Sequence, residues 1–85
     1  MEVTVYGQLR SATGEKTVDV DFDGGTVADA VDAFVAAYPR AKRHLVDGDG
    51  LASSVRLAVD GASATPDDDC PPDATLSIHP AMQGG

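Results

Sequence analysis

Apolar side chains recur at alternate positions in two segments near the start of the chain. They are Val3, Val5 and Leu9 in the first segment, and Val18, Val20 and Phe22 in the second. Alternation with a period of two is typical of a strand that buries one face. Residues 11–14, between the two segments, have the composition of a turn. The pattern therefore predicts an antiparallel hairpin.

The period changes after the glycine pair at 24–25. A stripe of apolar residues follows at helical spacing, formed by Val27, Val31, Phe34, Val35 and Tyr38. This spacing predicts an amphipathic helix. Thr26 is placed to cap its first turn, with Asp29 as the reciprocal partner in a capping box. Pro39 disfavours helical geometry at the residue before it, so the helix should end at Tyr38.

The rest of the chain predicts more strands and a tail. We expect one further helical turn in residues 40–46, a loop at 47–50, and a strand around Leu57 that ends at a turn at residues 60–61. Residues 62–74 should form loops with one short edge strand, and Leu76 and Ile78 mark a final strand. These elements predict an α+β fold of the β-grasp (ubiquitin-like) type, a small mixed sheet packed against one main helix. Residues 1–79 would form this domain and residues 80–85 a flexible carboxyl-terminal tail.

Charge narrows the classes of partner. Fourteen acidic and six basic residues give a net charge of −8, which argues against binding to nucleic acid. The acids are almost all aspartate, which favours a halophilic source, where salt screens the repulsion between them. The chain shows no signal peptide or membrane span, and Cys70 alone cannot form an internal disulfide. We therefore expect a soluble, cytoplasmic domain.

Sites for a metal ion or a nucleophile are poorly supported. Residues 19–24 reproduce the opening of a calcium-binding loop, but Ala30 stands where the loop needs a bidentate glutamate. Two histidines and one cysteine do not make a conventional zinc site, so we expect no metal. Cys70 should lie in a loop, with a thiol pKa that the neighbouring aspartates at 67–69 raise.

A basic cluster directly follows the predicted helix and has two interpretations. It consists of Arg40, Lys42 and Arg43, with His44 beside them. The cations could simply complement the dipole at the carboxyl end of the helix. Alternatively, they could form a docking patch for an acidic partner surface.

The chain ends in Gly84-Gly85. Glycine has no Cβ and adopts φ of either sign, so this end is narrow and flexible. It could enter a channel and present the Gly85 carboxylate to an ATP-binding site in another protein. The reactive group would then be that carboxylate, and the folded domain would serve as a handle.

The residues resemble the MoaD/ThiS branch of ubiquitin-like β-grasp proteins, and within it the small archaeal modifier proteins of halophilic archaea. The most specific matches are residues 25–31 with 38–39, residues 55–61, and residues 80–85. The resemblance implies that an activating enzyme of the ubiquitin-activating (MoeB/ThiF-like) type adenylates Gly85 with ATP. Either a target lysine then forms an isopeptide bond, or sulfur replaces an oxygen to give a thiocarboxylate. By the same resemblance, the segment that enters a partner consists of Pro80, Ala81, Met82, Gln83 and Gly84.

The resemblance also implies a carrier rather than an enzyme, with no cofactor bound by the chain itself. A molybdopterin synthase large subunit or a tRNA-thiolation enzyme would be further partners, and Lys16 and Lys42 are possible acceptors of a second modifier. One departure is His79-Pro80, where relatives often have an aromatic residue and two prolines. Two alternatives remain open: a dedicated small subunit of molybdopterin synthase that forms no conjugates, and a β-grasp module that binds without covalent chemistry.

Overall fold

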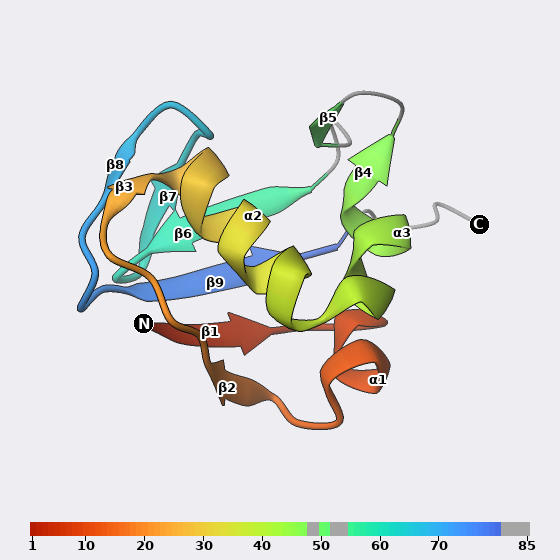
Figure 1. Ribbon diagram of the computed structural model, residues 1–85. Helices are drawn as coiled ribbons and strands as arrows, with labels where there is room; N and C mark the ends of the chain where they lie inside the picture. Colours follow the sequence, from red (N-terminus) through yellow and green to blue (C-terminus); the bar gives the residue numbers. More distant parts are fainter. Residues whose placement is uncertain (48–49, 52–54, 81–85) are drawn as a thin grey trace.

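The computed structural model describes residues 1–47, 50–51 and 55–80. Its main layer is a five-stranded sheet with the order β2-β1-β9-β6-β7, and helix α2 lies across one face of it (Figure 1). These strands are β1 (Glu2–Val5), β2 (Thr17–Asp19), β6 (Arg56–Val59), β7 (Ala62–Ala64) and β9 (Thr75–His79). The first and last of them, β1 and β9, pair in parallel, and every other pairing in this sheet is antiparallel. The predicted α+β, β-grasp arrangement is confirmed.

Helix α2 (Val27–Ala37) has the predicted start and end. The Asp29 amide donates to Thr26 Oγ1 at 3.2 Å, and the Thr26 amide donates to Asp29 Oδ2 at 3.1 Å. This reciprocal pair is the capping box. Tyr38 leaves helical geometry, with φ −130° and ψ 76°, immediately before Pro39.

The core lies between α2 and the sheet. The largest buried side chains are those of Phe34, Leu9, Leu45, Leu76 and Ile78. Alternation along β9 explains its part in this core, since Leu76 and Ile78 are buried while the residues between and after them are not. The buried residues of the described chain include no polar or charged side chain.

The connection between the first two strands differs from the prediction. Strand β1 ends at Val5. Leu9, which we predicted in the first strand, begins a short helix α1 (Leu9–Thr13) that also includes most of the predicted turn at residues 11–14. Gly7, with φ +59°, turns the chain out of the strand direction. Leu9 is still buried, but from a helix rather than from an extended strand. Strand β2 is also shorter than predicted, and Phe22 lies beyond its end and is only half-buried.

The later connections contain more structure than predicted. The extra turn after α2 is present, as η1 (Pro39–Ala41) and α3 (Lys42–Leu45). Strands β4 (Val46–Asp47) and β5 (Gly50–Leu51) pair where we predicted a loop. Strand β8 (Asp69–Cys70) pairs with β3 (Gly25–Thr26), so the placement of Cys70 in a loop was wrong. Each of these four strands has only two residues, which is too short to show a periodic pattern in the sequence.

Candidate functional site

The chain leaves the sheet at the end of β9, and this point is the root of the predicted tail. Residues 81–85, which include Gly84 and Gly85, lie outside the described residues, so their role stays a prediction. Pro80, which we had assigned to the tail, is buried. A Cβ added at Gly7 would lie 3.3 Å from Pro80 Cγ. Glycine at position 7 therefore satisfies both the left-handed backbone and the close approach of the proline ring.

An aromatic pair lies directly beside this root. The rings of Tyr6 and His79 stack with their centroids 4.0 Å apart and their planes 6° apart. The Lys16 ammonium lies 5.5 Å from the centre of the Tyr6 ring, within the range of a cation–π contact. Because Ile78 points into the core, His79 and its partner lie on the opposite face of the sheet, away from α2.

A shallow groove opens next to the same residues. It is lined by Tyr6, Gly7, Arg56, Leu57, Ala58, Ser63, His79 and Pro80. Arg56 lies opposite His79 in the β6–β9 register, which places one cation at the end of the last strand. Exposed aromatic residues and an arginine are features of a protein-docking surface. The sequence did not mark this groove, because its residues come from four separate segments.

The two predicted acceptor lysines are both exposed but lie in different settings. Lys16 lies immediately before β2 and is engaged with the Tyr6 ring. Lys42 is the first residue of α3, directly after η1.

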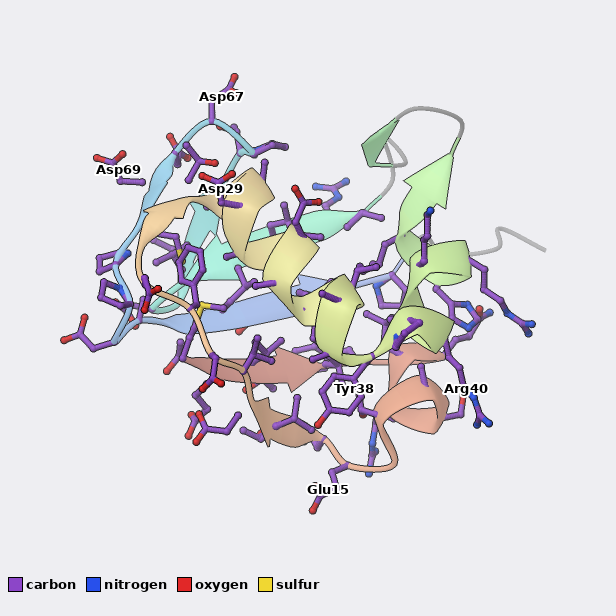
Figure 2. The ribbon with its side chains drawn as sticks, in the orientation of Figure 1. Glu15, Asp29, Tyr38, Arg40, Asp67 and Asp69 are labelled. Carbon is purple, nitrogen blue, oxygen red and sulfur yellow. The ribbon has the colours of Figure 1, made fainter. Side chains whose placement is uncertain are left out.

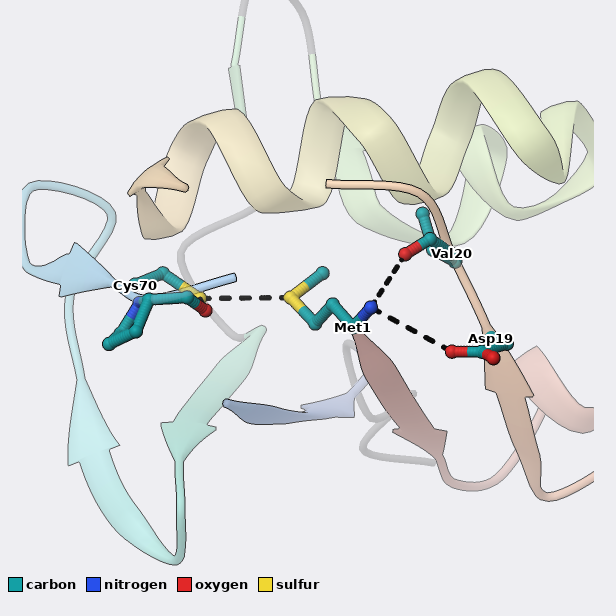
Figure 3. Close-up of polar contacts among 5 residues, drawn as sticks. Met1, Asp19, Val20 and Cys70 are labelled. Carbon is teal, nitrogen blue, oxygen red and sulfur yellow. Dashed lines mark hydrogen bonds and ion pairs between the residues drawn. The ribbon is translucent and has the colours of Figure 1, made fainter. Parts of the chain in front are cut away.

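Cys70 is buried and packs against Met1 (Figure 3). Its Sγ lies 3.7 Å from Met1 Sδ. Burial raises the pKa of the Cys70 thiol; Asp60 raises it further, while the amino-terminal ammonium opposes the shift. The predicted direction of the pKa shift is confirmed, but its causes are burial and Asp60 rather than the aspartates at 67–69. A thiol that is protonated near neutral pH and out of contact with solvent is a poor nucleophile.

The acidic residues do not gather into a metal site in the part of the chain that the structure describes. Asp19, the first residue of the calcium-like motif, lies in β2, 3.7 Å from the Met1 ammonium (Figure 3). That ammonium also donates to the Val20 carbonyl at 2.8 Å. Asp21 and Asp23 are exposed. No helix among the described residues is long and apolar enough to cross a membrane.

The basic cluster after α2 forms one side of a second pocket. Arg40, Arg43 and His44 line it together with Ser11 and Ala12 of α1. The last turn of α2 contains no basic residue. Because the effect of a helix dipole falls off within the last turn, the dipole of α2 does not explain the position of these cations, which lie in the last turns of the short helices η1 and α3.

Comparisons with known proteins agree with this architecture. The ThiS family model matches residues 3–85. Small archaeal modifier protein 1 of Haloferax volcanii is 32% identical over 87 residues, spanning 100% of both chains. A crystal structure of SAMP1 from Haloferax volcanii is similar with a TM-score of 0.85 and 30% identity, covering 100% of this chain and 98% of that one. The Amycolatopsis orientalis BexX/CysO complex contains a chain that is similar with a TM-score of 0.78 and 26% identity, covering 99% and 98%. This chain therefore belongs to the ThiS family of small ubiquitin-like carrier and modifier proteins.

Proposed function

We propose that this chain is a protein modifier and sulfur carrier that acts through the carboxylate of Gly85. An activating enzyme of the ubiquitin-activating type would bind the tail and ATP together. The Gly85 carboxylate attacks the α-phosphate of ATP, and pyrophosphate leaves. The resulting acyl-adenylate is electrophilic at its carbonyl carbon, and two products follow from it.

In the first route, a target lysine in its neutral amine form attacks the carbonyl carbon. AMP leaves, the amine loses a proton and an isopeptide bond forms. In the second route, hydrosulfide supplied by a sulfur donor attacks the same carbon. AMP leaves, the added sulfur loses its proton, and the product is a thiocarboxylate that can pass its sulfur on. The chain itself holds no cofactor in this scheme, because the activating enzyme binds the ATP.

The observation that carries the proposal is the position of the tail root. Pro80 is anchored beside Gly7, and five residues that end in Gly84-Gly85 follow it. Five residues span at most about 17 Å when extended, which is enough to carry the carboxylate well into a partner. The groove beside Pro80 would then hold the partner's surface while the tail enters its active site. Family membership supports this division between a handle and a reactive end.

The test compares the wild-type chain with a variant that lacks Gly84 and Gly85. Both are expressed in a haloarchaeal host and blotted under denaturing, reducing conditions. An antibody against the folded domain is preferable to an amino-terminal tag, because the Met1 ammonium is hydrogen-bonded to Val20 and paired with Asp19. High-mass bands that vanish with the deletion would support conjugation, and bands that persist without the glycines would contradict it.

Mass spectrometry then identifies the linkage. No lysine or arginine follows Arg56, so trypsin would leave residues 57–85 on each target. Cleavage at Met82 with cyanogen bromide would instead leave the short remnant Gln83-Gly84-Gly85 on the target lysine. Lys16→Arg and Lys42→Arg variants would show whether the chain also modifies itself.

The sulfur route has its own readout. The intact protein is incubated with ATP, an activating enzyme and a sulfur donor, and its mass is measured. Exchange of one carboxylate oxygen for sulfur would support the carrier function. Thiocarboxylate without any conjugates would favour the dedicated subunit of molybdopterin synthase. The absence of both thiocarboxylate and conjugates would favour the non-covalent module.

A further inference from the structure

The cations of this acidic chain gather at the end of the molecule where the tail begins. Lys16 and Arg56 lie at the aromatic pair and groove beside Pro80. Arg10 lies in α1, just after Gly7. The remaining three lysines and arginines are Arg40, Lys42 and Arg43, on η1 and α3. All six lysine and arginine residues therefore lie around the carboxyl end of β9.

Most acids lie at the other end. Asp67 and Asp69 are far from Arg40 in Figure 2. The acidic group formed by the β2–α2 connection and the loops around β7 and β8 comprises Asp19, Asp21, Asp23, Asp60, Asp67, Asp68, Asp69 and Asp73. Glu15, beside Lys16, and Asp47, in β4 directly after α3, are acids at the basic end. The basic residues and most of the acids therefore lie at opposite ends of a molecule whose net charge is −8.

Basic residues on η1 and α3 line a pocket that α1 closes on the other side. Two arginines and a half-buried histidine line it, and none of its lining residues in the described part of the chain is acidic. The one ion pair observed among the side chains of residues 1–45 and 55–80 is Met1–Asp19, which lies outside this pocket. In a chain with more than twice as many acids as bases, the grouping of these cations in one pocket indicates a site for an external acidic group.

The pocket is structurally linked to the root of the tail. Gly7 lies beside Pro80. The Gly7 carbonyl accepts a hydrogen bond from the Arg10 amide at 3.2 Å. The helix that follows, α1, supplies Ser11 and Ala12 to the pocket and packs against η1. A partner that receives the tail would therefore face both the groove at Pro80 and this pocket.

We propose that the pocket lined by Ser11, Arg40, Arg43 and His44 docks a carboxylate-rich segment of the partner protein that receives the tail. This inference rests on the proposed function only in its choice of partner. Guanidinium groups bind carboxylates through two parallel hydrogen bonds, so Arg40 and Arg43 supply the main donors. Arg10 and Lys42 extend the positive surface on either side, which suits several carboxylates along a segment rather than one small ion.

The separation of charge between the two ends adds orientation to this contact. An acidic partner surface attracts the basic end and repels the acidic end, so the molecule approaches with its tail first. A long polyanion such as nucleic acid would extend from the pocket onto the acidic end and be repelled there. A short acidic protein segment therefore fits the charge distribution better.

The first test uses a defined probe, a hexaglutamate peptide, added to isotope-labelled protein at low ionic strength. Amide NMR signals of Ser11, Ala12, Arg40, Arg43 and His44 should shift, and they should not shift with hexaglutamine. An Arg40→Gln/Arg43→Gln variant should lose most of this binding. The matched control, Lys16→Gln/Arg56→Gln, removes the same charge from the neighbouring groove and should retain it. Equal losses in both variants, or tighter binding of a deoxythymidine oligomer at the same residues, would overturn the proposal.

The second test measures ATP-dependent activation by a purified activating enzyme. An Arg40→Glu/Arg43→Glu variant has an intact tail, so kcat should be unchanged while KM for the modifier rises about tenfold. Circular dichroism and thermal melting confirm that the variant is folded. If the wild-type chain is not activated at all, the proposed function fails, and the peptide titration still decides the docking site. If the wild type is activated and the Arg40→Glu/Arg43→Glu variant has the same KM, this docking role is wrong.

Discussion

At the scale of single residues, Gly7 meets two requirements, a left-handed backbone and a close approach to Pro80. Gly7 has φ +59°, a region that side chains with a Cβ enter only at a cost, and it also faces Pro80. Gly14 has φ +80° at the end of α1 but has no heavy atom within 4 Å of an added Cβ. Both glycines therefore have a left-handed backbone, but only Gly7 lies against another residue, Pro80.

This difference gives a matched pair of substitutions. Gly14→Ala should lower the free energy of unfolding by about 1 kcal/mol, the cost of left-handed geometry. Gly7→Ala should cost about 2 kcal/mol, because the new methyl group also presses on Pro80. Urea unfolding of both variants measures these costs. Activation of Gly85 should slow only in Gly7→Ala, and equal behaviour of the two variants in both assays would show that the Pro80 contact is unimportant.

At the scale of elements, the acidic loop before β8 accepts hydrogen bonds from the first amides of α2. The Val27 amide donates to the Asp68 carbonyl at 2.8 Å, and the Ala28 amide donates to the Pro66 carbonyl at 2.9 Å. Together with the Thr26–Asp29 capping box, these bonds satisfy the first amide groups of the helix. The helix start is thus fixed by a local cap and by a segment about forty residues further along the chain.

The local part of this cap can be tested alone. Thr26→Ala removes the acceptor for the Asp29 amide and should lower the free energy of unfolding by about 1 kcal/mol. Thr26→Ser keeps the hydroxyl oxygen and should cost only a few tenths of a kcal/mol. Asp29→Ala combined with Thr26→Ala should cost less than the sum of the two changes, since each residue caps the other. Strictly additive costs in chemical denaturation would argue against a reciprocal box.

Sequence predicted the elements whose signals are local. The start and end of α2 follow from Thr26 and Pro39, and β6 and β9 follow from alternating apolar residues closed by turns. The helix α1 was missed because Leu9 continues the apolar pattern of the first strand, and Gly7 alone redirects the chain. The pairing of β3 with β8 and the groove beside Pro80 were missed because each joins segments that are distant in sequence.

At the scale of the whole molecule, the separation of charge leaves most acids without partners. Among the described residues the one ion pair joins the Met1 ammonium to Asp19, while Asp67, Asp69 and Asp73 are exposed at the same end. Like charges held together in a folded chain repel one another, and the unfolded chain relieves this repulsion. Folding therefore concentrates a repulsion that salt should weaken.

We predict that the melting temperature rises with KCl between 0.1 M and 1 M, as the Debye length falls from about 10 Å to about 3 Å. An Asp67→Asn/Asp73→Asn variant removes two of the crowded charges without touching a side-chain hydrogen bond seen in the structure. It should melt higher than the wild type at 0.1 M, by a few degrees if it recovers about 1 kcal/mol, and the two proteins should converge at 1 M. Calorimetry at each salt concentration separates this charge effect from a general effect of salt on apolar burial. The general effect would raise the melting temperatures of both proteins by the same amount. A parallel rise of both melting curves would therefore refute repulsion between the acids as the cause.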